Sequence, residues 1–181
     1  MKRINNANDF EFLFDTTFGD IDKRSLSEAK DKKLRITLGG EGNDSLRVEQ
    51  AFIRSIKILQ YCFSSKSILL RMILWSKNEE KNLEHAGFQL KKADKVLRRK
   101  DDDEILYAHF NTFSRIVLSP IIKSIINFEM AEEPSANITC YFVSFNSELI
   151  INVYDDRGVD VYSPNIELLN KIKAKFFDWL I

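Results

Sequence analysis

The chain has 181 residues, and its 27 Lys and Arg are balanced by 27 Asp and Glu. This length fits one domain that buries its own core without disulfides or a structural metal. A net charge of zero argues against a general DNA or RNA binder, because such proteins carry a basic excess that displaces counterions from phosphates.

The first elements are a short helix and a strand. Asn8 or Asp9 can cap a helix whose apolar face runs from Phe10 to Phe18, and Gly19 ends it. After a polar connection, residues 34–38 alternate between apolar and polar side chains, which predicts a strand.

A long central helix and an interior strand follow. Residues 46–63 place apolar side chains at three- and four-residue steps, with Ile53 and Cys62 widening the buried face. The glycine-rich loop at 39–42 before it lacks the lysine of a phosphate-binding loop, so we expect a flexible connector. Residues 67–75 are almost continuously apolar, which is typical of a strand inside a sheet.

Residues 77–104 form a polar insertion. One helical turn is predicted at 83–88, and the basic tract 91–100 is followed at once by the acidic tract 101–104. The favoured interpretation of the basic tract is a solvated helix or loop with internal salt pairing.

The last third alternates again between strands and helices. Strands are predicted at 105–110, 138–145, 149–154 and 159–162, with helices that begin at Ser119-Pro120 and Ser163-Pro164. The order predicts a single α+β domain, with a mainly antiparallel sheet and helices packed on one face.

The turn between the last two strands is the most charged short segment. Asp155 and Asp156 favour a turn because Asp hydrogen-bonds to its own backbone, and Arg157 is expected to pair with one of them. Gly158 is expected to supply a left-handed residue. With Asp160 nearby the cluster could chelate a divalent cation, but hairpin architecture is the favoured interpretation.

Residues with catalytic chemistry are scarce. His85 and His109 lie in unrelated contexts, and Cys62 and Cys140 do not form a Cys-x-x-Cys pair. We therefore expect no metal site, no cofactor and no catalytic residue. The N-terminus lacks a signal peptide pattern and no apolar run is long enough to cross a bilayer, so a cytoplasmic location without a membrane partner is expected.

Four segments resemble a bacterial domain family of unknown function. The segment Tyr154–Val161 reads YDDRGVDV and is similar to the family's YDDRG-x-D hairpin, and the ending Phe177–Ile181 is similar to its usual tail. Weaker matches are Arg35–Gly39, where Thr37 replaces a more common Glu, and Arg47–Ala51.

Many members of that family are encoded beside toxin genes of interbacterial competition. The resemblance therefore implies an immunity protein, of the type found in contact-dependent growth inhibition, which binds one toxin and occludes its active site. An expected partner is a nuclease or other toxin, and the oligomeric state stays open between a monomer and a weak dimer. The expected contact residues are Asp101, Asp102, Asp103, Glu104, Asp155, Asp156 and Arg157.

Two alternatives remain from the residues themselves. One is a nucleic-acid-binding α+β domain that uses the basic segment 91–100 and exposed aromatic side chains on a sheet. The other, which is weaker, is a hydrolase that uses Asp155, Asp156 and His109.

Overall fold

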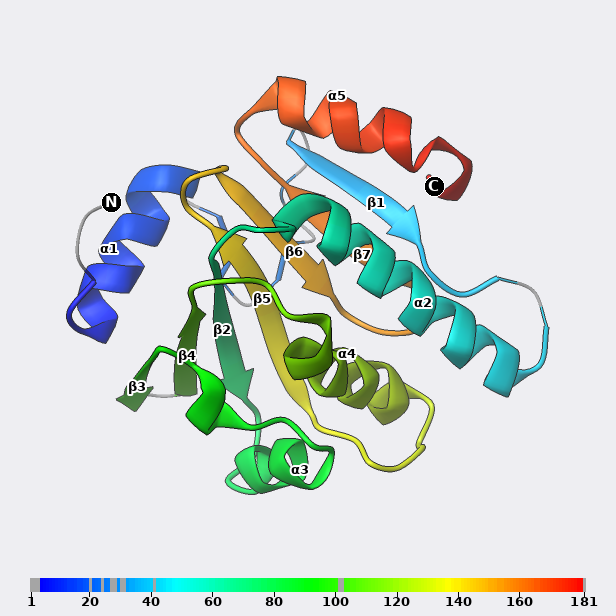
Figure 1. Ribbon diagram of the computed structural model, residues 1–181, viewed down its shortest axis with the longest axis horizontal. Helices are drawn as coiled ribbons and strands as arrows, with labels where there is room; N and C mark the ends of the chain where they lie inside the picture. The colour runs from blue at the N-terminus through cyan, green and yellow to red at the C-terminus, as the bar shows by residue number, and fades with distance from the viewer. Residues whose placement is uncertain are drawn as a thin grey trace.

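A seven-stranded sheet forms the centre of the protein, and each pair of neighbouring strands is antiparallel. This computed structural model describes residues 4–180 except 20, 24, 27, 28, 30, 31, 41, 101 and 102. The strands are β1 (Lys33–Thr37), β2 (Ile68–Leu74), β3 (Lys95–Lys100), β4 (Glu104–Phe110), β5 (Ile138–Ser144), β6 (Leu149–Val153) and β7 (Gly158–Tyr162). Their order across the sheet is β1-β7-β6-β5-β2-β4-β3 (Figure 1).

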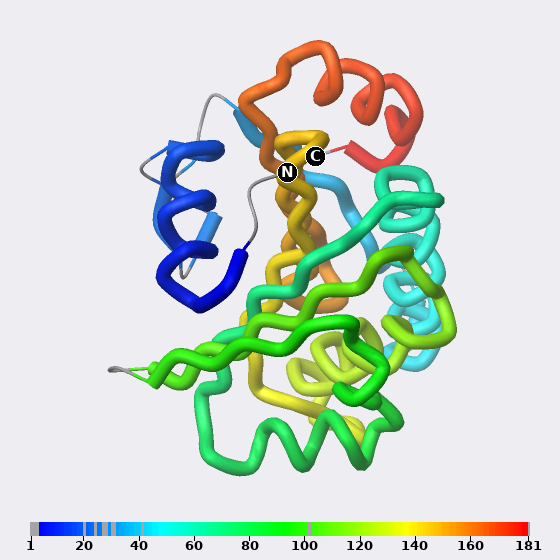
Figure 2. The backbone as a smooth tube through the Cα atoms, turned by 60° about the vertical axis from the view of Figure 1, so that its left-hand side comes forward, coloured from blue at the N-terminus to red at the C-terminus, as the bar shows by residue number. Residues whose placement is uncertain are grey.

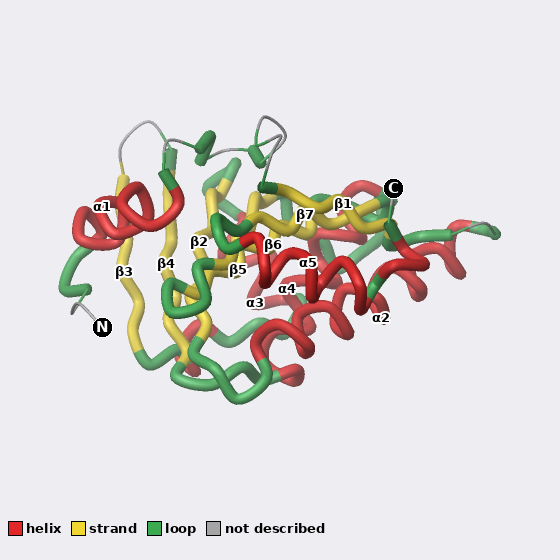
Figure 3. Tube along the Cα trace, turned by 90° about the horizontal axis from the view of Figure 1, so that it is seen from above, coloured by secondary structure: helices red, strands yellow, loops and turns green. Residues whose placement is uncertain are grey.

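Helices cover both faces of the sheet. The helices are α1 (Ala7–Phe18), α2 (Asp44–Phe63), α3 (Glu79–His85), α4 (Arg115–Glu129) and α5 (Ile166–Lys175), with short 3-10 turns η1 (Leu90–Lys92) and η2 (Phe177–Trp179). In Figure 2, α1 lies on the opposite side of the sheet from α2 and α4, and Figure 3 shows α2, α4 and α5 together on one side of β6 and β7. The predicted α+β domain with an antiparallel sheet is confirmed, while α1 departs from the expected one-sided packing.

The position of α1 follows from two separate apolar clusters. Strand side chains alternate between the faces, so each strand contributes to both. The larger cluster packs α2, α4 and α5 against one face. The smaller cluster packs Phe10, Phe14 and Phe18 of α1 against side chains such as Leu69 and Tyr141 on the other. In the described part of the chain, no helix combines the length and apolarity needed to span a bilayer.

Helix α4 begins earlier than the sequence suggested. Ser114 accepts a hydrogen bond from Val117 N at 3.4 Å and caps a helix that starts at Arg115, so Pro120 lies inside the helix. Leu118 is fully buried in this first part of the helix. Its burial stabilises a turn that the Ser119-Pro120 pattern excluded.

The basic tract 91–100 contains a strand that the sequence analysis missed. Residues Lys95–Lys100 pair with β4 as β3 and form one edge of the sheet. Basic side chains are common on edge strands because they prevent edge-to-edge association. The insertion around this strand also contributes Leu83 and Phe88 to the main apolar cluster.

Candidate functional site

The turn between β6 and β7 is closed by Asp155. Its Oδ1 accepts hydrogen bonds from the backbone N–H groups of Arg157 at 2.7 Å and Gly158 at 3.2 Å, and its Oδ2 accepts from Arg157 Nε at 2.6 Å. Asp155 is 2% exposed, whereas the Arg157 side chain is 72% exposed. The expected pairing of Arg157 with an aspartate of the turn is confirmed, and this carboxylate raises the pKa of Arg157.

Asp156 connects the same turn to α2. Its Oδ2 lies 2.5 Å from Nη2 of Arg47, in the first turn of that helix. The backbone contributes two more contacts, because Gly39 N donates to Asp156 O at 2.6 Å and Leu38 N donates to Arg157 O at 3.0 Å. The turn is therefore docked onto the segment between β1 and α2.

Asp160 connects β7 to β1. Arg35 lies directly opposite on β1 and donates from Nε at 2.9 Å and Nη2 at 3.1 Å to the two Asp160 oxygens. Lys33 Nζ is 3.6 Å from the same carboxylate. The guanidinium of Arg35 also lies 5.2 Å from the ring centre of Tyr154. The hydrogen bonds and charge of Asp160 raise the pKa of Arg35.

Two glycines allow these segments to approach closely. A Cβ on Gly39 would lie 2.7 Å from the carbonyl oxygen of Asp156, and a Cβ on Gly158 would lie 2.9 Å from Cζ of Tyr154. Gly158 does not adopt a positive φ, so the predicted left-handed residue is wrong. A Cβ at Gly158 would instead overlap the hydroxyl end of Tyr154, so the tyrosine side chain would have to move.

Three of the four segments that carry the family resemblance thus meet at one place. We call this cluster the arginine–aspartate joint, and it consists of Arg35, Arg47, Asp155, Asp156, Arg157 and Asp160. Each aspartate is at most 3% exposed and has its own arginine partner. The joint therefore holds β1, the start of α2 and the β6–β7 hairpin together.

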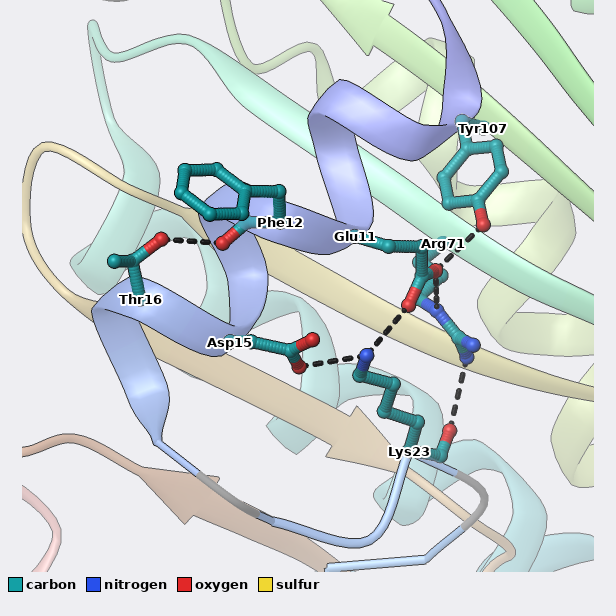
Figure 4. Close-up of polar contacts among 7 residues, drawn as sticks. All are labelled: Glu11, Phe12, Asp15, Thr16, Lys23, Arg71 and Tyr107. Carbon is teal, nitrogen blue, oxygen red and sulfur yellow. Dashed lines mark hydrogen bonds and ion pairs between the residues drawn. The ribbon is translucent and has the colours of Figure 1, made fainter.

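A second buried polar cluster lies beneath α1 (Figure 4). Glu11 of α1 is 6% exposed and accepts hydrogen bonds from Arg71 Nε at 2.9 Å and the Tyr107 hydroxyl at 2.5 Å. Lys23 Nζ lies 2.9 Å from Glu11 and 2.6 Å from Asp15. Arg71, which is 4% exposed, also donates to the Lys23 carbonyl at 2.9 Å.

The charges in this cluster stabilise one another. Burial by itself would raise the pKa of Glu11, but Arg71, Tyr107 and Lys23 together lower it below the usual value. Burial and the hydrogen bond to Glu11 raise the pKa of Tyr107, so its hydroxyl stays protonated and donates. The only sign of this cluster in the sequence is Arg71, a charged residue within an otherwise apolar strand.

The register extends this polar character across the whole sheet. Arg71 is aligned with Tyr107 on one side and Tyr141 on the other, and the row continues through Asn152 and Asp160 to Arg35. The network under α1 and the Arg35–Asp160 pair of the joint therefore lie on one row of one face. Residues from six strands meet there without sharing any pattern in the sequence.

The described part of the acidic tract, Asp103 and Glu104, lies between β3 and the start of β4. Asp101 and Asp102 are outside the described residues, and Glu104 begins β4, where Lys100 Nζ lies 3.2 Å from its carboxylate. Asp103 is half-buried beside it. Glu104 on β4 is three strand positions from β6, and the turn after β6 holds Asp155 and Asp156, whose carboxylates bind arginines of the chain.

The proposed hydrolase residues do not come together. His109 on β4 is aligned through Leu69 and Val143 with Ile150, at the beginning of β6, whereas Asp155 follows the end of that strand. Three strand spacings and five residues along a strand separate them by about 20 Å. Asp155 and His109 do not share a substrate site, and this hypothesis is wrong.

The remaining reactive side chains are also buried or isolated. Burial raises the pKa of Cys62 to about 12 and raises that of Cys140 as well, so both thiols stay protonated. His85 is exposed on α3. No group of three or more His, Cys, Asp or Glu within the described ranges could hold a metal ion.

A groove of about 430 Å³ lies between α2 and the C-terminal turn. We call it the α2 groove, and it is lined by Leu46, Glu49, Gln50, Ile53, Arg54, Lys57 and Trp179. Leu46 is 57% exposed and Ile53 is 40% exposed, so the prediction that Ile53 widens the buried face is wrong. Ile53 instead points outward because Val48, Ala51 and the rest of the helix's buried face already fill the core.

Apolar exposure continues beyond this groove. Tyr61 is 44% exposed and its ring packs edge-on against Phe176 at 5.5 Å, while Phe176 stacks on Trp179 at 5.2 Å. Phe177, which follows Phe176 in the chain, is 70% exposed. The surface of α2 and the C-terminal turn therefore carries a row of large apolar side chains.

The fold and these sites define an α+β protein with an antiparallel sheet, a buried ionic joint and an exposed apolar surface. The chain belongs to the family described as a domain of unknown function (DUF3885), whose model matches residues 10–181. No curated protein and no solved structure matches the chain.

Proposed function

We propose that this protein is a cytoplasmic immunity protein, which binds a cognate antibacterial toxin and neutralises it by occluding the toxin's active site. The observation that carries the proposal is the row of exposed apolar side chains on α2 and the C-terminal turn. Large apolar patches on a soluble protein mark interaction sites. The resemblance of the YDDRG hairpin to proteins encoded beside toxins supports the same function.

The structural role of the YDDRG residues agrees with a protein that acts by binding. The aspartates of the hairpin are engaged inside the arginine–aspartate joint, so the motif stabilises a scaffold. Affinity would then come from the surface that the scaffold presents.

Co-expression with the toxin encoded by the neighbouring gene tests this proposal. We expect cells that carry both proteins to grow, and the purified pair to co-elute in size-exclusion chromatography. A non-cognate toxin is the control, and it should kill the cells despite the immunity protein. A cognate toxin that neither binds nor is neutralised would refute the function.

A second candidate function is nucleic-acid binding through the basic segment 91–100. Lys91 and Lys92 are exposed on η1, and the Lys100 side chain is 71% exposed, which favours this alternative. Two ion pairs weaken this alternative. Arg98 forms a bidentate pair with Glu80 at 2.7 and 2.8 Å, and Lys100 pairs with Glu104, so carboxylates already neutralise these two basic side chains. A mobility-shift assay with single-stranded DNA and RNA at increasing salt would decide, and an unshifted band at low salt would eliminate it.

A further inference from the structure

Arg54 differs from the other arginines described above because it has no carboxylate partner in the described part of the chain. Its Nη1 donates to the carbonyl oxygen of Thr37 at 3.3 Å, and its guanidinium lies 5.0 Å from the ring centre of Trp179. Carboxylate partners are found for Arg35, Arg47, Arg71, Arg98 and Arg157. Arg54 therefore retains donors that can reach an external group.

The surroundings of Arg54 favour an anion. Burial lowers the pKa of Arg54, and no neighbouring carboxylate offsets this effect. Lys57, on the same side of α2, adds a second positive charge to the groove. Glu49 is the only acid among the lining residues, and it lies nearer the start of the helix, beside Leu46. The half of the groove next to Trp179 is therefore basic and aromatic.

An arginine stacked on a tryptophan is well suited to hold a carboxylate. The aromatic ring orients the guanidinium plane, and the free edge of the plane matches the two oxygens of a carboxylate. Ile53 and Leu46 provide an adjoining apolar floor of the same groove. Arg and Trp are also among the residues that contribute most to binding energy at protein interfaces.

We infer that the α2 groove binds an acidic segment of a partner protein, in which an Asp or Glu pairs with Arg54 and Lys57 and a neighbouring bulky apolar side chain packs on Ile53 and Leu46. The inference rests on the proposed function, since it names the chemistry of the surface through which such a partner is held. It also moves the contact region away from the acidic tract and the hairpin turn.

Synthetic peptides test this inference without a toxin. One set combines Asp or Glu with Leu, Ile, Phe or Trp, and a matched set carries Lys at each acidic position. The chain has two tryptophans, so Trp75→Phe leaves Trp179 as the fluorescent reporter inside the groove. We expect peptides of the acidic set to bind and to change the fluorescence emission of Trp179. Because the Lys set reverses the charge of the peptide, its affinity should be lower by about tenfold or more.

Variants of the groove provide the controls. Arg54→Glu should lower the affinity for the acidic peptides by about tenfold or more and raise the affinity for the Lys set. Lys171→Glu on α5 makes the same charge change outside the groove and should leave both affinities unchanged. Lys57→Glu, at an exposed position, repeats the test if Arg54→Glu does not fold. Failure of every acidic peptide to bind, or equal binding by wild type and both groove variants, would overturn the inference.

Assays with the cognate toxin distinguish a failure of the groove inference from a failure of the proposed function. A toxin that is bound and neutralised equally by wild type and Arg54→Glu would preserve the function and refute the groove as its contact surface. Selective binding of acidic peptides without any neutralised toxin would preserve the groove and refute the function.

Discussion

Removing Glu11 is expected to destabilise the protein strongly. Glu11→Ala leaves Arg71, which is 4% exposed, with no carboxylate and with the Lys23 carbonyl as its other partner. It also removes the acceptor of the Tyr107 hydroxyl. Breaking a buried ion pair by removing one partner typically costs about 3–5 kcal/mol, because the remaining charge is uncompensated.

Removing the arginine of this pair should cost less stability than removing Glu11. After Arg71→Met, Glu11 still lies 2.9 Å from Lys23 Nζ and still accepts from Tyr107, so its charge keeps two partners. The double variant Glu11→Leu/Arg71→Met removes both charges and replaces them with apolar side chains. We expect its free energy of unfolding to return to within about 2 kcal/mol of wild type, since such replacements are often neutral or stabilising.

Urea and thermal unfolding followed by circular dichroism measure these differences. For a chain of this size each kcal/mol corresponds to about 2–4 °C, so Glu11→Ala should lower Tm by about 6–20 °C. A matched control is Asp9→Ala, which removes a half-buried carboxylate from the same helix and should cost only about 1 kcal/mol through its loss from the capping box. The reasoning is refuted if Glu11→Ala costs no more than this control, or if the double variant is no more stable than Glu11→Ala.

Three further outcomes are expected. The partners of Glu11 lower its pKa below 4.5, so its contribution to stability is present above pH 4.5 and is lost as the pH falls through the pKa of the folded state. In a plot of the free energy of unfolding against pH, Glu11→Gln should therefore show a smaller decrease at acidic pH than wild type. An unchanged decrease would contradict this. Gly158→Ala should destabilise by about 1–3 kcal/mol through overlap with the Tyr154 ring, and by less in combination with Tyr154→Ala, which thermal unfolding can check. Cys62 and Cys140 should react with a thiol reagent at neutral pH only after denaturation, because burial raises the pKa of both, and rapid labelling of the native protein would argue against this.

Local patterns predicted most helices and strands. Helix α1 ends before Gly19 and α2 covers the apolar steps that predicted it, because both patterns are set by residues within a few turns of one another. Two errors arose where packing overrides local preference. Burial of Leu118 extends α4 before Pro120, and pairing with β4 makes a strand of the basic residues in β3.

The sites were less predictable than the elements. The sequence identified the hairpin aspartates and explained Asp155, whose partners lie within three residues. It did not pair Asp156 with Arg47 or Asp160 with Arg35, which are separated by 109 and 125 residues. No periodicity reports such contacts, because they depend on which strands become neighbours.

The sequence by itself therefore determined the α+β class, the antiparallel character and the β6–β7 turn, since hydrophobic periodicity and turn chemistry act over short distances. The tertiary structure alone decided that β1 pairs with β7, that Arg71 and Glu11 meet beneath α1, and that Ile53, Arg54 and Trp179 share a groove. These contacts exist only after strand order and helix placement bring distant residues together.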